Sequence, residues 1–352
     1  MTRRALTTTV AALAAVVCLS MSPQQFAAQS SGVSPLDSAA IAREAAHLPR
    51  LYSLLVSRSG TTIFERYFNG ATAARPANIK SASKSIISAL VGIAIDRKLI
   101  ADVRQPIGPF FDTMLTGDAA SEKRRITIEN LLTMQSGLQS TSNRNYGAWV
   151  QSPNWVRHAL SRPLESLPGT RMAYSTGNTH LLSAILTKVT GTSTWQFAQD
   201  ALAKPLGFSL ARWPQDPQGI YFGGNDMLLT PRQMLAFGEL YRNHGSLNGR
   251  QIVPASWVET SLVPRTRSNF SDQMYGYGWW LREMAGLETF FAWGFGGQFI
   301  IVVPTIETVV VSTSAATVAD DRRSHRRTVD DLIERLVIGP LSDAARDSEG
   351  PQ

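Results

Sequence analysis

The stretch Ser81-Ala82-Ser83-Lys84 places a serine and a lysine three residues apart, ahead of apolar residues at three- and four-residue steps: Ile86, Ile87, Leu90, Val91, Ile93 and Ala94. This spacing predicts an amphipathic helix over residues 81–98, with Ser81 and Lys84 on one face of its first turn. A serine hydroxyl becomes nucleophilic when a neighbour takes its proton, and a lysine with a lowered pKa can do this. The pair is a candidate nucleophile and base.

The motif is weak by itself, because chance supplies it often. The chain has 34 serines and 6 lysines among 352 residues, so roughly 0.6 such pairs are expected by chance. In the alternative interpretation, Ser81 caps a helix and Lys84 is a solvated surface charge. Other segments of the chain have to decide between these interpretations.

Composition predicts one large globular domain, since 43% of the residues are hydrophobic and 17% are charged. The formal net charge is +7, which is only mildly basic. The one dense basic cluster comprises Arg322, Arg323, His325, Arg326 and Arg327 and has no interleaved aromatic residues. We interpret it as the solvated start of a helix and expect no nucleic acid as partner.

The first thirty residues have the pattern of an export signal. Arg3 and Arg4 precede an apolar run from Val10 to Leu19, and a polar stretch follows. We therefore expect a periplasmic or secreted protein whose mature form has no stable membrane insertion. A lipid anchor at Cys18 is not expected, because a lipobox needs a small residue where Val17 lies.

Cys18 is the only cysteine, so the mature chain would lack cysteine nucleophiles and disulfides. The five histidines are scattered and show no H-E-x-x-H spacing. We therefore expect no metal and no cofactor.

The order of predicted elements indicates an α+β fold, in which N- and C-terminal strands form one antiparallel sheet, helices flank it and a large all-helical insertion covers about 81–262. The predicted strands are 51–57, 61–68, 277–281, 289–293, 298–303 and 308–314. The predicted helices are 38–46, 81–98, 127–134, 153–161, 177–190, 194–203, 231–244, 254–262 and 327–337. We find no internal repeat or linker and expect one domain over 31–345, followed by a disordered tail over 346–352.

Three further segments raise the value of the serine–lysine pair. They are Ile126 to Leu138 (ITIENLLTMQSGL), Tyr174-Ser175-Thr176, and Ala292 to Gln298 (AWGFGGQ). With Ser81 to Lys84, in this order, the chain resembles the penicillin-recognising serine hydrolases, which include serine β-lactamases, D-alanyl-D-alanine peptidases, esterases and amidases. The resemblance extends from about residue 51 to residue 337. It is closest to the class C-like branch with carboxylesterases and 6-aminohexanoate-dimer hydrolase.

The resemblance implies a role for each motif. Ser81 would be the nucleophile, Lys84 the general base and Tyr174 the proton relay. The backbone N–H groups of Ser81 and Phe295 would form the oxyanion hole. Alternatives remain for the single motifs: Tyr174 as a packing residue, and Ala292 to Gln298 as a glycine-rich hairpin turn.

Two positions depart from the antibiotic-acting members. Their third motif begins with a lysine or histidine that helps to hold a substrate carboxylate, whereas this chain has Ala292. Their second motif carries asparagine where this chain has Thr176, and Asn178 lies two residues further on. These departures favour a small-molecule ester or amide as substrate.

Candidate substrate contacts are fewer and less specific than the catalytic set. Gly294 is expected to let the backbone approach the substrate, with Trp293 beside it. Tyr146 and Trp155 could belong to an aromatic wall over the cleft, although ordinary loop packing explains them equally well. Asp226 is expected to be structural, because it lies in a loop that leads into a helix.

The sequence therefore predicts an exported serine hydrolase that cleaves small esters or amides through an acyl-enzyme on Ser81. One alternative keeps the mechanism and makes the substrate a β-lactam or a peptidoglycan stem peptide. Another is a non-catalytic binding protein on the same fold. The sequence leaves the natural substrate and the oligomeric state open.

Overall fold

The computed structural model describes residues 36–117 and 120–349. The predicted export signal lies outside these residues. Within them, no helix is both long and apolar enough to cross a lipid bilayer.

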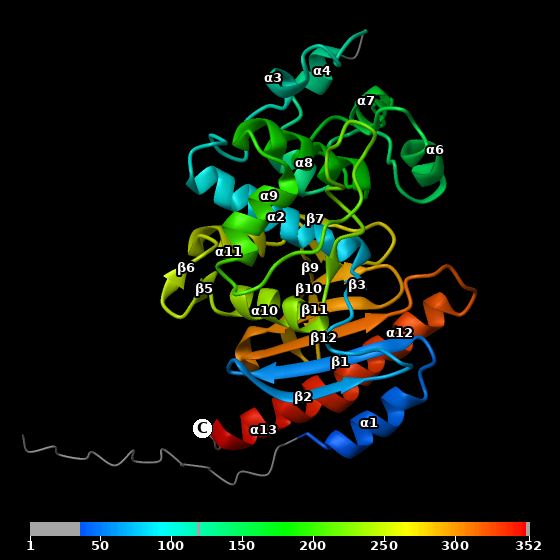
Figure 1. Ribbon diagram of the computed structural model, residues 1–352, viewed down its shortest axis with the longest axis vertical. Helices are drawn as coiled ribbons and strands as arrows, with labels where there is room; N and C mark the ends of the chain where they lie inside the picture. The colour runs from blue at the N-terminus through cyan, green and yellow to red at the C-terminus, as the bar shows by residue number, and fades with distance from the viewer. Residues whose placement is uncertain (1–35, 118–119, 350–352) are drawn as a thin grey trace, which may run out of the picture. The chain divides into compact units, whose positions relative to one another are not determined.

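One eight-stranded sheet forms the centre of the described chain, with every pair of neighbouring strands antiparallel (Figure 1). The strand order is β2-β1-β12-β11-β10-β9-β8-β7, so the N-terminal hairpin is hydrogen-bonded to the last strand of the chain. The strands are β1 Leu51–Arg58, β2 Thr61–Tyr67, β7 Thr266–Arg267, β8 Met274–Tyr275, β9 Trp280–Met284, β10 Leu287–Gly294, β11 Gln298–Val303 and β12 Thr308–Ser314. The predicted antiparallel sheet built from both ends of the chain is confirmed.

The inner strand β11 is apolar from Phe299 to Val303 because both faces of the sheet are covered. Side chains alternate between the faces along a strand. In β11, Phe299, Ile301 and Val303 belong to one hydrophobic core, whereas Ile300 and Val302 belong to the other. The sheet thus separates two cores.

Helices from the two ends of the chain cover one face of the sheet (Figure 1). These are α1 Ser38–Ala46, α12 Arg322–Ile333, the turn η5 Glu334–Ile338 and α13 Gly339–Glu349. The prediction of a disordered tail from residue 346 is wrong for residues 346–349, which continue α13. Leu341 of this helix is fully buried, and its burial stabilises the helix against the sheet.

The other face is covered by the helical segment between β2 and β7, in which α10 packs on β11 and β12. Its helices are α2 Ser83–Asp96, α3 Gly108–Phe111, α4 Ala120–Arg124, α5 Ile128–Leu132, α6 Tyr146–Val150, α7 Trp155–Ser161, α8 Thr176–Thr190, α9 Thr194–Ala198, α10 Pro231–Arg242 and α11 Ala255–Ser261. The three short helices α3, α4 and α6 were not predicted. Two small two-stranded antiparallel sheets pair β3 Ala77–Asn78 with β4 Leu228–Leu229, and β5 Ser246–Leu247 with β6 Arg250–Gln251.

Helix α2 differs from the predicted amphipathic helix. Every residue from Ser83 to Ala94 is buried, because α8 and α11 pack against it. A helix that is enclosed on all sides needs no polar face. The strand predicted at 277–281 also begins later, at Trp280, because Gly278 has a left-handed φ of 80° and turns the chain before it.

Candidate active site

Ser81 lies in a single turn of 3-10 helix, η1 Lys80–Ala82, directly before α2. The turn begins at Lys80, whose φ of 51° is left-handed and whose backbone N–H donates to Asn78 Oδ1 at 3.0 Å. Ser83 Oγ closes the turn by donating to the Lys80 carbonyl at 2.6 Å. The α-helix therefore begins at Ser83 rather than at the predicted residue 81, and Ser81 lies on a short segment before it that hydrogen bonds hold at both ends.

Lys84 Nζ lies beside Ser81 Oγ, at 3.2 Å. It also lies 2.6 Å from the Gly224 carbonyl and 3.3 Å from Thr176 Oγ1. The side chain is 1% exposed, and this burial lowers the pKa of Lys84 to about 7, against the opposing charge of Asp226. In its neutral form the amine can donate two N–H groups, to Gly224 and Thr176, and keep its lone pair for the Ser81 hydroxyl.

Tyr174 lies directly before Ser175, the N-cap of α8. Its ring centroid is 5.0 Å from Lys84 Nζ, and the ring stacks on Trp280 at 5.7 Å. Burial raises the pKa of Tyr174 to about 12, and a hydrogen bond with Ser81 opposes this shift. At neutral pH the phenol therefore keeps its proton and can pass one on without becoming a stable phenolate.

Gly294 ends β10 and packs against the backbone just before Ser81. A Cβ atom at this position would lie 2.1 Å from the Ile79 carbonyl oxygen, so only glycine allows the contact. Gly294 does not line the cleft described below, and the prediction that it approaches the substrate is replaced by this packing role. The close contact holds Phe295, the next residue, at the same cleft as Ser81.

A cleft of about 960 Å³ connects these groups. Its lining residues are Lys80, Ser81, Ser142, Asn143, Tyr146, Tyr174, Thr176, Asn225, Phe270, Trp280, Trp293, Phe295, Gly296, Ala316, Val318, Arg322, Arg323, Arg326 and Arg327. The structure thus brings Ser81, Tyr174 and Phe295 to one cleft, with Lys84 buried behind Ser81. Of the candidate substrate contacts, Trp293 and Tyr146 lie on its wall.

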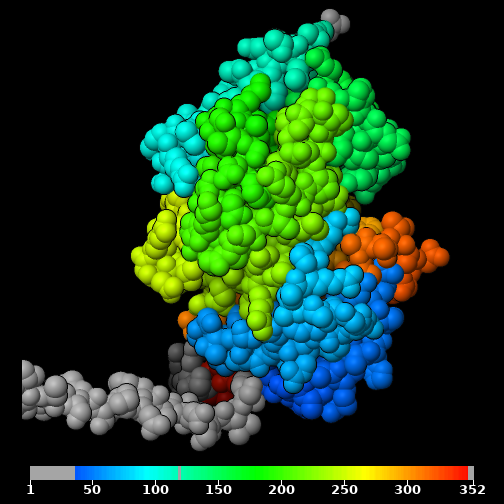
Figure 2. All heavy atoms as spheres, viewed as in Figure 1, coloured from blue at the N-terminus to red at the C-terminus, as the bar shows by residue number. Residues whose placement is uncertain are grey.

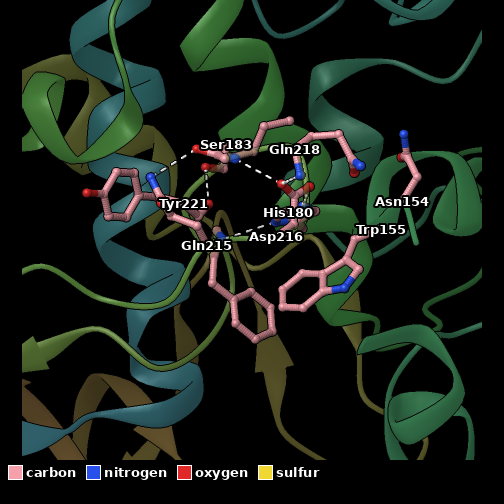
Figure 3. Close-up of polar contacts among 12 residues, drawn as sticks. Asn154, Trp155, His180, Ser183, Gln215, Asp216, Gln218 and Tyr221 are labelled. Carbon is pink, nitrogen blue, oxygen red and sulfur yellow. Dashed lines mark hydrogen bonds and ion pairs between the residues drawn. The ribbon is translucent and has the colours of Figure 1, made fainter. Parts of the chain in front are cut away.

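Trp155 lies elsewhere, and its prediction as a substrate contact is not supported. It is 8% exposed and packs against His180 at a ring distance of 5.4 Å (Figure 3). His180 Nε2 lies 3.1 Å from Asp216 Oδ2, and its Nδ1 lies 3.4 Å from the Gly223 backbone N–H. This buried group therefore supports the loop whose next carbonyl, at Gly224, accepts from Lys84.

Asp226 is closer to the site than the sequence predicted. Its Oδ1 accepts from Lys80 Nζ and from Asn78 Nδ2, both at 2.8 Å. The same carboxylate raises the pKa of Lys84 against the larger effect of burial. Asp226 thus holds the residue before Ser81 in place and acts on the candidate base Lys84. No local pattern reveals this, because Lys80 and Asp226 are 146 positions apart.

The basic cluster at the start of α12 keeps part of its predicted solvated role, since Arg323 and Arg327 are exposed, but it also faces the cleft. Its four arginines line the same cleft as Ser81. The guanidinium of Arg322 lies over the Phe295 ring at 4.5 Å, and that of Arg326 over the Trp293 ring at 4.9 Å. The sequence predicted a helix in this region, but it did not predict that the arginines at its start face the cleft that contains Ser81.

Solved structures with a similar fold include three hydrolases. A Bacillus anthracis protein assigned as a 6-aminohexanoate-dimer hydrolase has a TM-score of 0.67 and 21% identity, covering 86% of this chain and 81% of its own. EstCE1, a hydrolase with promiscuous acyltransferase activity, has a TM-score of 0.67 and 17% identity, and the match covers 84% of this chain and 97% of EstCE1. A D-stereospecific amidohydrolase from a Streptomyces species has a TM-score of 0.66 and 16% identity, and the match covers 85% of this chain and 98% of the amidohydrolase.

No curated protein matches the chain in sequence. The family model described as Beta-lactamase, in contrast, matches residues 50–334. The matched region begins just before β1 and ends after α12, so it contains the complete sheet and all residues of the candidate site. Because this match covers most of the chain, the protein belongs to the Beta-lactamase family.

Proposed function

We propose that this protein is a serine hydrolase that cleaves small esters or amides through an acyl-enzyme on Ser81. The observation that carries the proposal is the position of Lys84 Nζ, buried and 3.2 Å from Ser81 Oγ, with a pKa lowered to about 7. A lysine on the surface would be protonated at neutral pH and unable to accept a proton. Burial removes this obstacle where a nucleophile needs a base.

In the proposed acylation step, Ser81 Oγ attacks the substrate carbonyl carbon while Lys84 Nζ takes the hydroxyl proton. The carbonyl oxygen becomes an oxyanion, and the backbone N–H groups of Ser81 and Phe295 donate to it. As the tetrahedral intermediate collapses, the bond to the leaving group breaks. Tyr174 gives its proton to that leaving group and regains one from Lys84.

Deacylation repeats these transfers with water in place of the serine. Lys84 Nζ, neutral again, takes a proton from water directly or through Tyr174, and the resulting hydroxide attacks the acyl carbon. Collapse of the second intermediate returns the proton to Ser81 Oγ and releases the acid. No other reactant is needed, and the donors that stabilise the oxyanion are the same in both steps.

The preference for small esters and amides over β-lactams rests on Ala292. This residue is fully buried in the core between the sheet and the helices. A cation that holds a substrate carboxylate from this position is therefore absent. Structures with similar folds include esterases and amidohydrolases as well as β-lactamases and penicillin-binding proteins, so the preference rests on Ala292 alone.

The test is a panel of p-nitrophenyl esters and short linear amides on the wild type and on Ser81→Ala. We expect hydrolysis by the wild type and loss of at least about 1,000-fold in kcat/KM in the variant. Ser121→Ala, at an exposed serine of α4, is the matched control and should behave as the wild type. No hydrolysis in the wild type, or equal rates in Ser81→Ala, would contradict the proposal.

Intact-mass measurement separates the β-lactam alternative. After exposure to a p-nitrophenyl ester, a transient acyl adduct should appear on the wild type and be absent from Ser81→Ala. After exposure to benzylpenicillin, we expect no adduct. A lasting penicilloyl adduct on Ser81 would instead favour a penicillin-binding function.

A further inference from the structure

We infer that Arg322, Arg323, Arg326 and Arg327 form an anion subsite in the active-site cleft, which binds a carboxylate or phosphate group carried by the substrate. We call these four residues the arginine wall. The inference rests on the proposed function, because it assigns a chemical class to the substrate of that same cleft. It adds that this ester or amide is acidic.

The arginine wall faces the cleft rather than only the solvent. All four residues line it together with Ser81 and Phe295. The segment that leads from β12 into α12, coloured orange in Figure 2, lies at the surface, and Val318 within it is 82% exposed. Within the wall, Arg323 and Arg327 are themselves exposed, so a ligand that enters from solvent can reach it.

Two of the guanidinium groups are held in place by aromatic rings of the same cleft. Arg322 lies over Phe295, and Arg326, one helical turn later, lies over Trp293. Stacking on a ring leaves the N–H edge of a guanidinium free to donate to an oxyanion. Phe295 also carries the backbone N–H of the proposed oxyanion hole, so the wall lies in the same cleft as the reacting centre.

The described part of the protein provides no direct ion-pair partner for the wall. Among the described residues, none of the four arginines forms an ion pair, and no Asp or Glu lines the cleft. The nearby carboxylates serve other arginines: Asp321 pairs with Arg50 at 3.4 Å, and Asp330 accepts from Arg282. The fifth cation of the cleft, Lys80, is already paired with Asp226.

The local sequence concentrates like charges at the start of α12. Arg322 and Arg326, and likewise Arg323 and Arg327, are like charges four residues apart on a helix. Arg322 and Arg323 also occupy the first turn of α12, where the helix dipole disfavours cations. Burial lowers the pKa of Arg326, and Arg282 and Arg327 add to this effect against Asp330. A bound oxyanion would relieve all of these repulsions.

The wall also replaces the cation that Ala292 does not provide. An anion held at Ala292 would lie on the β10 strand itself, whereas the wall lies on α12, beyond Trp293 and Phe295. The expected substrate therefore carries its acidic group at some distance from the scissile carbonyl. A linear acyl chain with a terminal carboxylate fits this requirement.

The first experiment compares matched esters that differ only in this charge: p-nitrophenyl hydrogen adipate and suberate against their p-nitrophenyl methyl esters. In the wild type we expect kcat/KM to be about 10- to 100-fold higher for the acidic member, the usual effect of charge-assisted hydrogen bonds. The ratio should fall toward one in Arg322→Gln/Arg326→Gln and with added salt. Arg322→Lys/Arg326→Lys should retain part of it.

Arg157→Gln is the matched control, because Arg157 is an exposed arginine of α7 outside the cleft. It should leave the ratio unchanged. A leaving-group pair, 4-acetoxybenzoate and its methyl ester, tests the other end of the substrate. If neither pair shows a preference for the acidic member in the wild type, or if the preference survives in Arg322→Gln/Arg326→Gln, the inference is wrong.

Calorimetry on Ser81→Ala measures the subsite without hydrolysis, with adipate and inorganic phosphate as probes. Binding of either probe that is lost in Ser81→Ala/Arg322→Gln/Arg326→Gln supports the subsite, and the stronger probe identifies the acidic group. Hydrolysis of neutral esters without probe binding would refute the subsite and leave the proposed function intact. Probe binding without any esterase or amidase activity would refute the proposed function and support the subsite. Tight binding of an oligonucleotide alone would reassign the wall to nucleic acid.

Discussion

Replacing the buried amine of Lys84 should make the protein more stable while it abolishes activity. The pKa of Lys84 falls from its ordinary 10.5 to about 7, so at pH 7 and below the native state carries a penalty of about 5 kcal/mol for keeping this amine buried. Lys84→Met removes the penalty, but it leaves the Gly224 carbonyl without its donor, which costs about 1–3 kcal/mol. The net gain at pH 7 should be about 2–4 kcal/mol.

The gain should depend on pH with a defined sign. Between pH 7 and 10.5 the unfolded chain holds a proton on Lys84 that the native state lacks, so wild-type stability rises with pH in this window. The advantage of Lys84→Met should therefore be largest at pH 7 and below and shrink toward pH 10. Urea denaturation of both proteins at pH 6.5, 7.5, 8.5 and 9.5 measures this difference directly.

Two other lysines serve as controls. Lys98→Met, at an exposed position, should give a small stability difference that does not change with pH. Lys123, buried and hydrogen-bonded to the Leu160 carbonyl at 2.8 Å, lies outside the cleft, so Lys123→Met should retain esterase activity. A wild type more stable than Lys84→Met at pH 7, or a difference constant across the pH range, would refute the reasoning.

Three further predictions concern catalysis and packing. The kcat/KM for a neutral ester should fall as pH drops below about 7, because protonated Lys84 cannot accept the serine proton. Asp226→Asn should move this fall to lower pH, because Asp226 raises the pKa of Lys84. A shift of the pH–rate profile to higher pH in Asp226→Asn would contradict this reasoning. Tyr174→Phe should lower kcat by about 100- to 1,000-fold with an unchanged unfolding midpoint, and an unchanged kcat would remove Tyr174 from the mechanism. Gly294→Ala should lose about 1–3 kcal/mol of stability and most activity, because its Cβ would lie 2.1 Å from the Ile79 carbonyl; a wild-type melting temperature and rate would show that the segment before Ser81 yields freely.

The sequence predicted the sheet well because its signal is local. In β11, a short apolar run bounded by turns indicated a strand, and the structure has it with the same bounds, Gln298–Val303. The same kind of reasoning misjudged α2, since a period of apolar residues shows one buried face but does not show that neighbouring helices cover the polar face too. It also ended the last helix early, because the burial of α13 against the sheet has no marker in its own residues.

For the candidate site, the sequence alone determined which groups are close neighbours along the chain. Three-residue spacing puts Ser81 and Lys84 within reach of each other, because backbone geometry controls that distance. This holds for a helix that begins at Ser81 and also for the observed arrangement, in which Ser81 lies in the 3-10 turn before α2. The family resemblance added Tyr174 and Phe295, which the structure brings to the same cleft.

Only the tertiary structure decided the environment of these groups. The lowered pKa of Lys84 arises from burial by α8 and the loop at Gly224, which no local pattern encodes. Three other features are likewise contacts between distant segments. Asp226 pairs with Lys80, Trp155 packs in an interior aromatic cluster, and the four arginines of α12 face the cleft. Such contacts follow from how the sheet and helices pack, and a charge pattern read along one helix does not show what that helix faces.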